Sequence, residues 1–308
     1  MHLIVFPNLI QETNGEFKCF VHGRLYDKDK LAQLQHHKHS TEPNAKNTIK
    51  YAYKTLKHKH RITTIKYYCH EMDISFELQQ SRYTCQLTMS KEQLFALSQA
   101  YEHCRILPLH SKSHDTIYYL LHLSQQGTSI ISDVDDTIIE TKAMTLLKSL
   151  KQLMRGYQVV SHMDTLYSML SQMGFDFHYV TSSPDFLFSV FYPLIEPGNP
   201  NKRFPLGSYH SMENSKDAIK TSDRISHKIH HVVRLMTLFP QRQFVFIGDN
   251  GQSDVDVYNR VHQIMGKESH RIKAVYIRNV LNSASSTEQL FRDGLDLKDL
   301  FFKRFDIE

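Results

Sequence analysis

The alternation of hydrophobic and polar positions along the chain changes its rhythm near residue 125. Before that point, short runs rich in β-branched and aromatic residues are separated by polar, turn-like residues, a pattern that predicts strands. Two segments, residues 45–57 and 91–101, instead carry hydrophobic positions at helical spacing. We therefore expect residues 1–125 to form a small β-rich domain with strands at residues 3–6, 17–23, 63–69, 73–78 and 83–88.

From residue 126 onward, predicted strands alternate with predicted helices. The expected strands are residues 129–132, 177–180, 243–247 and 272–277. The expected helices are residues 142–155, 162–173, 185–192, 226–238 and 255–265. This alternation is typical of a parallel sheet with helices on both faces. We therefore expect residues 126–308 to form a second, α/β domain.

Composition and charge are compatible with this division. The 308 residues leave room for two domains on the usual scale of ~150 residues each. The formal charge of +5 and the pI near 8.8 fall far short of a nucleic-acid-binding tail, so no nucleic-acid partner is expected. A mild positive balance suits an anionic substrate or an anionic membrane surface.

Several features predict a cytoplasmic protein that touches membranes only peripherally. No stretch approaches the ~20 apolar residues that cross a bilayer, and the first residues are too short for a signal peptide. The four cysteines form no CxxC pair and are expected to be reduced thiols. The helix expected at residues 45–57 carries a lysine face, which would either contact anionic lipid or simply be solvated.

An acidic cluster follows directly on the apolar run that ends at Ser132. Asp133, Asp135 and Asp136 fall within four positions at the end of a predicted strand. Like charges beside a low-dielectric core are costly, and a divalent cation such as Mg²⁺ would remove the repulsion. The pair Asp133 and Asp135 suits one nucleophilic carboxylate and one acid/base. The alternative is a helix N-terminus capped by Asp or Thr.

Polar groups also follow two other predicted strands. Thr181 and Ser182 come after residues 177–180, and Asp249 comes after residues 243–247, with Asp254 close behind. In such sheets the ligand lies beyond the carboxyl ends of the strands. Each group also has a plain structural reading, as a helix cap, a turn or an acid at a helix N-terminus. Together, acids, hydroxyls and a lysine are the groups that handle a phosphoryl group with a metal.

Four ordered motifs between residues 126 and 280 resemble those of the haloacid dehalogenase superfamily. A narrower resemblance is to the App1-like phosphatidate phosphatases. It rests on Ser132-Asp133-Val134-Asp135-Asp136-Thr137-Ile138, Val180-Thr181-Ser182-Ser183-Pro184, Phe204-Pro205-Leu206-Gly207 and Phe246-Ile247-Gly248-Asp249-Asn250-Gly251-Gln252-Ser253-Asp254. The resemblance implies a Rossmann-like parallel sheet, without a cap domain, behind a β-rich leader.

The resemblance also implies a role for each matching residue. Asp133 is the nucleophile and a Mg²⁺ ligand, and Asp135 is the acid/base with its carbonyl oxygen on the metal. Asp249 is a metal acid, and Asp254 is either a ligand through water or a residue that orients the site. Phosphate contacts fall to Thr181, Ser182 and a helix lysine, for which Lys228 is the best match and Lys220 and Lys216 are weaker ones. Lys228 could instead be a solvated helix lysine.

The sequence departs from the family pattern at two positions near the expected substrate. Ser208-Tyr209-His210-Ser211 stands where the family usually carries Leu-Arg, and Asp185-Phe186 stands where Trp is usual. The gaps between motifs are too short for a folded cap, and an open site suits a bulky substrate.

The resulting hypothesis is a Mg²⁺-dependent phosphatase that converts phosphatidate to diacylglycerol and phosphate. The alternatives are a phosphatase for a phosphoprotein or a soluble phosphate ester, and a non-catalytic membrane- or protein-binding module. The sequence leaves the oligomeric state open.

Overall fold

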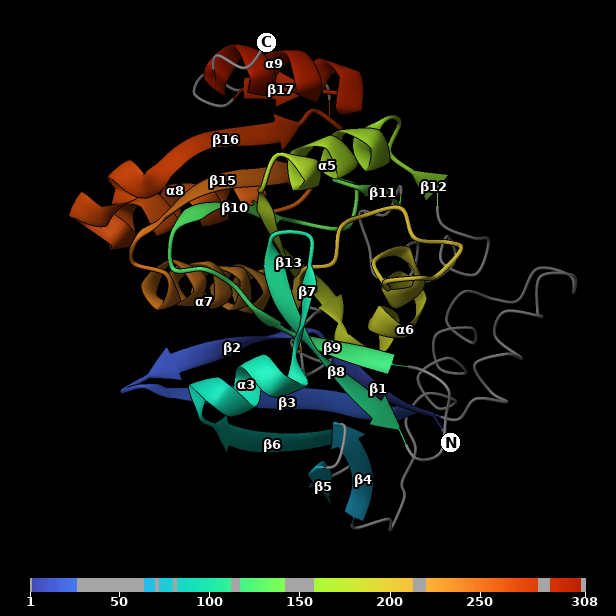
Figure 1. The fold of residues 1–308 in the computed structure, drawn as a ribbon. Coiled ribbons are helices and arrows are strands. Elements are labelled where there is room, and N and C mark those ends of the chain that lie inside the picture. The colour runs from blue at the N-terminus through green and yellow to red at the C-terminus, as the bar shows by residue number, and fades with distance from the viewer. Residues whose placement is uncertain are drawn as a thin grey trace, which may run out of the picture. The chain divides into compact units, whose positions relative to one another are not determined.

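The computed structural model describes residues 2–26, 64–69, 72–79, 82–111, 117–141, 158–212, 220–281 and 289–305. The chain divides into two compact units, Met1–Ser124 and Gln125–Glu308. Figure 1 shows a mostly β first unit (blue to green) and a mixed second unit (green to red). Each unit is described here by itself. The helix predicted at residues 45–57 and the candidate Lys216 lie outside the described residues.

The first unit is built around one sheet with the strand order β1-β3-β2-β9-β8-β4-β5-β6, in which β7 also pairs with β8. A further pairing between β3 and β6 closes the sheet on itself. All five predicted strands are present, as β1, β3, β4, β5 and β6, while β2, β8 and β9 were not predicted. The strands are β1 His2–Phe6, β2 Asn8–Thr13, β3 Glu16–Tyr26, β4 Thr64–Cys69, β5 Met72–Gln79, β6 Arg82–Met89, β7 Gln99–Tyr101, β8 Cys104–Ser111 and β9 Ile117–His122.

The helix predicted at residues 91–101 is shorter than expected. Helix α3 spans Lys91–Leu97, with Ser90 as its N-cap in a capping box, and residues 99–101 form β7 instead. The hydroxyl of Ser98 donates to the Leu94 carbonyl at 2.5 Å. Arg105 on β8 donates to the Ser98 hydroxyl and carbonyl, each at 2.8 Å. These bonds hold Ser98 in an extended conformation and turn the chain into a strand.

The second unit contains a six-stranded sheet in the order β14-β13-β10-β15-β16-β17. All neighbouring strands are parallel. Strand β10 lies at the centre, between β13 and β15, so the chain runs outward from it in both directions. Its Ile130 and Ile131 are fully buried. The strands are β10 Gly127–Ser132, β13 Asp176–Pro184, β14 Ser208–Met212, β15 Arg242–Asp249, β16 Ile272–Arg278 and β17 Gln289–Phe291.

Helices cover both faces of this sheet, as the sequence predicted. Helices α5 and α9 pack together, and α7 packs with α8; Figure 1 shows α9 beside β17 at the top and α7 below β10. The helices are α5 Met163–Gln172, α7 Thr221–Leu238, α8 Asp254–Met265 and α9 Gly294–Phe305. Gly174 follows α5 with a φ of 89°, the left-handed conformation that glycine accepts readily at a helix end.

Some parts of the second unit differ from the prediction. Strands β14 and β17 and helix α9 were not predicted. Residues 185–192, expected as one helix, form three short pieces: η2 Asp185–Leu187, α6 Phe188–Phe191 and η3 Tyr192–Leu194. Pro193 stands in the first turn of η3, where a ring without an N–H ends the helical ladder. A small antiparallel pair joins β11 Ile139–Glu140 to β12 Gln158–Val159, and the helix predicted at residues 142–155 lies outside the described residues.

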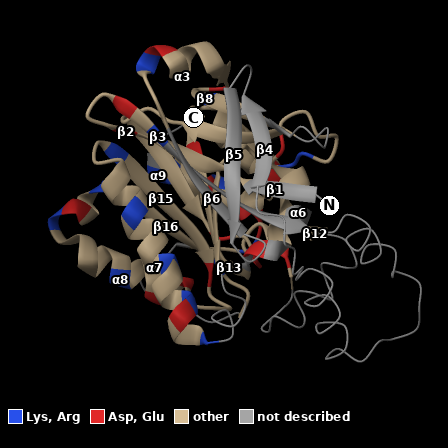
Figure 2. Ribbon diagram, turned by 90° about the horizontal axis from the view of Figure 1, so that it is seen from below, with Lys and Arg blue, Asp and Glu red and all other residues tan. Residues whose placement is uncertain are grey.

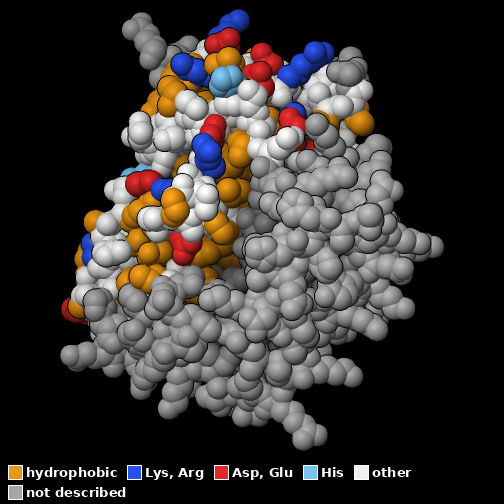
Figure 3. All heavy atoms as spheres, turned by 90° about the vertical axis from the view of Figure 1, so that its right-hand side faces the viewer, with side chains coloured by type: hydrophobic (Ala, Val, Ile, Leu, Met, Phe, Trp, Pro, Cys, Tyr) orange, Lys and Arg blue, Asp and Glu red, His pale blue; other side chains and the backbone are white. Residues whose placement is uncertain are grey.

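The charged residues of the second unit lie mainly outside the sheet. Figure 2 shows β15 and β16 mostly tan, because their charged residues lie near the strand ends, while α7 and α8 carry charges of both signs. On the face seen in Figure 3, charged side chains of both signs lie close together with hydrophobic ones between them. Among the described residues, no helix combines the length and the apolar character that crossing a bilayer requires.

Candidate active site

The turn after β10 places Asp133 at the centre of the carboxyl-end edge of the sheet. Its backbone N–H donates to the Ile247 carbonyl at 2.9 Å, which continues the pairing of β10 with β15 by one residue. Val134 then accepts from Ile138 and Ile139, each at 3.1 Å, so the chain turns back instead of extending. The Asp133 side chain is 2% exposed.

The end of β13 faces the second acid of this turn. The hydroxyl of Thr181 donates to Oδ2 of Asp135 at 2.9 Å, and the hydroxyl of Ser183 donates to the same oxygen at 2.6 Å. Burial raises the pKa of Asp135, and the hydrogen bonds from Ser183 and Thr181 partly offset the rise. The two hydroxyls therefore fix the orientation of this carboxyl group, while burial keeps its pKa above the ordinary value for Asp.

Lys228 on α7 reaches the acidic cluster from one face of the sheet. Its Nζ lies 2.9 Å from Oδ1 of Asp133 and 2.5 Å from Oδ1 of Asp254, and its side chain is 3% exposed. Burial lowers the pKa of this lysine, but the carboxylates of Asp133, Asp254 and Asp249 outweigh burial and raise it overall. Lys228 is therefore a buried, charged residue of the site and not a solvated helix lysine.

The loop between β15 and α8 positions the remaining acids. Oδ1 of Asp249 accepts from the backbone N–H groups of Gly251 at 2.7 Å and Gln252 at 3.1 Å. Oδ2 of Asp254 accepts from the Asp249 N–H at 3.1 Å. A Cβ atom on Gly248 would lie 2.6 Å from that same Oδ2, so only glycine lets α8 begin this close to the strand.

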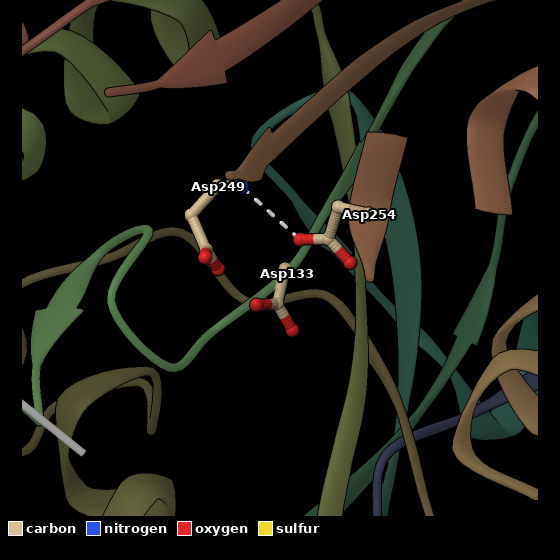
Figure 4. A group of neighbouring side chains, drawn as sticks. All are labelled: Asp133, Asp249 and Asp254. Carbon is tan, nitrogen blue, oxygen red and sulfur yellow. Dashed lines mark hydrogen bonds between the residues drawn. The ribbon is translucent and has the colours of Figure 1, made fainter. Parts of the chain in front are cut away.

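Asp133, Asp249 and Asp254 form a buried acidic triad whose ligand oxygens lie within 4.8 Å of one another. Figure 4 shows the three carboxyl groups converging from the end of β15, the start of α8 and the turn after β10. Burial and repulsion from Asp254 raise the pKa of Asp133, and the same two causes raise that of Asp249 to about 7. Repulsion among these buried carboxylates means that a positive charge at this edge of the sheet would stabilise them.

The triad fits a divalent cation by its chemistry. Oδ2 of Asp133 and Oδ2 of Asp249 are buried and have no hydrogen-bond partner among the described residues. Hard carboxylate oxygens are the ligands that Mg²⁺ takes in proteins. Lys228 supplies only one positive charge to three carboxylates. The residues present can therefore hold a cation of this class.

The other predicted site residues fall as follows. Ser182 is buried, and its hydroxyl has no partner among the described residues, whereas Thr181 contacts Asp135. Lys220 is the exposed N-cap position of α7 and contacts none of the three acids by a described ion pair. Ser183 was missed, although strand alternation places it on the same side of β13 as Thr181.

Comparisons with known proteins match the second unit. The family model described as "Phosphatidate phosphatase APP1, catalytic domain" matches residues 128–279. Phosphatidate phosphatase APP1 of Saccharomyces cerevisiae is 28% identical over 169 residues, which cover 53% of this chain and 28% of that protein. An uncharacterised protein of Schizosaccharomyces pombe is 23% identical over 171 residues, covering 52% of this chain and 26% of that protein. The chain thus matches less than a third of the length of these relatives.

Among solved structures, a carbohydrate esterase aligns over 100% of this chain and 98% of its own, at 9% identity and a TM-score of 0.27. A similarity this low carries no argument about the fold or the site. The family match rests on the sequence of residues 128–279, which contain the acidic triad, Lys228 and the hydroxyls of β13. Through these residues, the second unit matches the catalytic domain of the App1-like phosphatidate phosphatase family.

Proposed function

We propose that this protein is a Mg²⁺-dependent phosphatase of the haloacid dehalogenase type, acting through an aspartyl-phosphate on Asp133. The observation that carries the proposal is the acidic triad at the carboxyl-end edge of a parallel sheet, bridged by Lys228. The family to which residues 128–279 belong supports it. The proposed fold is a Rossmann-like sheet without a cap domain, and residues 1–125 and 126–308 are proposed as separate domains.

In this proposal each residue has one chemical task. The carboxylate of Asp133 attacks the phosphorus and displaces the alcohol. Asp135 protonates the leaving alcohol oxygen, and the phosphoryl group stays on Asp133. Asp135 then takes a proton from the water that attacks this aspartyl-phosphate, which releases phosphate and restores the Asp133 carboxylate. Thr181 and Ser183 hold Asp135 in place through the hydrogen bonds described above. Lys228 and the hydroxyl of Ser182 stabilise charge on the phosphoryl oxygens. The Thr181 hydroxyl, which the sequence predicted for the same role, donates to Asp135 instead.

The carboxyl groups of Asp133, Asp249 and Asp254 and the carbonyl of Asp135 are the groups proposed to hold Mg²⁺. Bound there, the ion would offset phosphate charge and align it with the nucleophile. Asp254 already accepts from Lys228 and from the Asp249 N–H. Asp254 would therefore act either as a ligand through water or as a residue that orients the other groups.

Phosphatidate is the proposed substrate, giving diacylglycerol and phosphate. The support is the family description together with the named relative, a phosphatidate phosphatase. Two departures from the family pattern lie near the acid/base. Asp185 and Tyr209 are both buried, and the charges of Asp135 and Asp185 add to the burial that raises the pKa of Tyr209. A phospholipid substrate further implies a cytoplasmic protein with peripheral contact to anionic membranes.

Phosphate release from two substrates tests the proposal. The full chain is incubated with Mg²⁺ and either phosphatidate vesicles or a soluble phosphate monoester, and phosphate is measured. We expect release from the vesicles, abolished in Asp133→Asn and after removal of Mg²⁺. Asp256→Asn is the matched control, because it makes the same change at an exposed position of α8 and should leave the rate unchanged.

The possible outcomes separate the alternatives. Cleavage of the soluble ester without cleavage of the vesicles would reject the lipid substrate and keep the phosphatase. Cleavage of neither would favour a non-catalytic binding module. Activity that survives Asp133→Asn would reject the aspartyl-phosphate mechanism.

A further inference from the structure

Asp136 belongs to the same turn as Asp133 and Asp135, and its backbone has an unusual conformation. Its φ is 58°, in the left-handed region that residues other than glycine seldom occupy. Its N–H donates to the Ile139 carbonyl at 2.7 Å. Its carboxylate accepts from the backbone N–H and the hydroxyl of Thr141, both at 2.8 Å. The shape of this turn therefore depends on the partners that hold Asp136.

Arg278 binds the remaining polar group of Asp136. Its Nη1 donates to the Asp136 carbonyl at 2.8 Å. Arg278 is the last residue of β16 and lies opposite Asp249 in the sheet register, so it stands beside both acid-bearing loops. Because its backbone is paired in the sheet, the bond from its side chain restrains the position of the turn.

The guanidinium group of Arg278 is itself anchored. Its Nε donates to the Arg292 carbonyl at 2.9 Å, and its Nη2 lies 3.6 Å from Oε1 of Glu140. The side chain is 14% exposed. One planar group thus contacts the turn after β10, strand β11 and the chain just after β17. A lysine carries all its donors on one nitrogen and lacks this planar fork, so it cannot reproduce the three contacts from three separate nitrogens.

We propose that Arg278 is a positioning residue of the active site, which holds the Asp133–Asp136 turn in the geometry that binds the cation and reacts. This inference rests on the function proposed above, because it concerns the same active site. Arg278 itself contacts none of the three acids of the triad by a described bond. Its role therefore runs through the Asp136 carbonyl and not through the reacting atoms.

A Mg²⁺ titration tests this role without relying on activity. The full-length wild type, Arg278→Ala, Arg278→Lys and Arg260→Ala are each titrated with Mg²⁺ while thermal unfolding is followed. Arg260 is an exposed arginine on α8 and serves as the matched control. We expect both Arg278 variants to keep the wild-type circular dichroism but to need at least threefold more Mg²⁺ for half of the maximal stabilisation. Arg260→Ala should titrate like the wild type.

Turnover gives the second readout. In both Arg278 variants we expect kcat to fall at least tenfold while KM changes less than twofold, because the substrate contacts are retained and the nucleophile is displaced. Added guanidinium ion, at a concentration that does not denature the protein, should restore part of the kcat of Arg278→Ala and leave the wild type unchanged. A purely structural defect would not respond to this ion.

The outcomes decide between the proposals. A wild-type Mg²⁺ titration and kcat in Arg278→Lys would overturn the positioning role, as would failure of both variants to fold. If Arg278→Ala alone fails to fold, Arg278→Lys decides. If the wild type is stabilised by Mg²⁺ but releases no phosphate, the proposed function fails while the titration still decides the role of Arg278. If Mg²⁺ does not stabilise the wild type, both proposals fail.

Discussion

The acidic triad holds more negative charge than its protein partners neutralise. Asp133, Asp249 and Asp254 share one buried ammonium group, that of Lys228, and two of their oxygens have no partner among the described residues. Burying unpaired charge lowers stability, and the raised pKa values of Asp133 and Asp249 report that cost. In the metal-free protein, repulsion within the triad should therefore lower the free energy of unfolding.

Asp249→Asn tests this consequence. The asparagine oxygen can still accept from the N–H groups of Gly251 and Gln252, but one buried negative charge is removed. We expect the metal-free variant to be more stable than the wild type by about 1–3 kcal/mol, and Mg²⁺ to stabilise it no further. Chemical denaturation with and without Mg²⁺ measures both effects. Equal or lower stability of the metal-free variant would show that the repulsion is not a dominant cost.

Ser183→Ala tests the hold on Asp135. The variant loses the 2.6 Å hydrogen bond from the Ser183 hydroxyl, and hydrogen bonds to charged groups contribute about 1.5–3 kcal/mol. We expect kcat to fall roughly tenfold or more on that scale, with KM little changed. Steady-state kinetics on the soluble ester measure this. Ser226→Ala, at an exposed position of α7, is the control. An unchanged kcat in Ser183→Ala would show that Ser183 is not needed to position Asp135.

At the scale of elements, the parallel strands gather the site. Strands β10, β13 and β15 are neighbours in the sheet, and their carboxyl ends bring Asp133, the β13 hydroxyls and Asp249 together. The order of these elements and most of the site residues could be predicted from the sequence, because each acid or hydroxyl directly follows an apolar run. The close approach of α8 to β15 follows from Gly248, whose missing Cβ makes room for Asp254.

Other elements could not be predicted for identifiable reasons. Strand β14 contains polar residues, Ser208 and His210, that are buried because they bond to each other at 2.9 Å, while Ser208 also bonds to His178 at 2.7 Å. A hydrophobicity pattern cannot show such internal pairing. Ser183 was missed although it lies on the same side of β13 as Thr181, and its bond to Asp135 joins residues 48 positions apart. Contacts of this length appear only once the sheet has assembled.

The buried histidine of β13 predicts a pH dependence of stability. His178 bonds to Ser208 and Ser129, and burial together with the nearby Arg242 charge lowers its pKa to about 3. In the unfolded chain its pKa is about 6.5, so below that pH the unfolded state binds more protons and stability falls as the pH is lowered. The loss from this residue is about 2 kcal/mol between pH 6.5 and 5.

Denaturation at a series of pH values isolates this contribution. The raised pKa values of Asp133 and Asp249 act in the opposite direction, so the comparison is between the wild type and His178→Gln. We expect the variant to be less stable at pH 7 but to lose about 2 kcal/mol less than the wild type between pH 6.5 and 5. His262→Gln, at an exposed position of α8, should keep the wild-type slope. Parallel pH curves for wild type and His178→Gln would contradict the assignment.

At the scale of the whole molecule, every residue of the proposed site belongs to one compact unit. The triad, Lys228, the β13 hydroxyls and Arg278 lie within Gln125–Glu308, and all six described strands of the sheet that positions them belong to this unit. The family match also falls within residues 128–279. The chemistry should therefore be separable from whatever Met1–Ser124 contributes.

A chain of residues 125–308 tests this separation. We expect it to be stabilised by Mg²⁺ like the full chain and to cleave the soluble ester at a rate within about threefold, since ~1.4 kcal/mol corresponds to tenfold. Thermal unfolding and phosphate release on both substrates provide the comparison. A selective loss on phosphatidate vesicles would assign lipid presentation to the first unit, because the soluble ester reports the chemistry alone. If residues 125–308 fold but are not stabilised by Mg²⁺, the first unit must help to form the site.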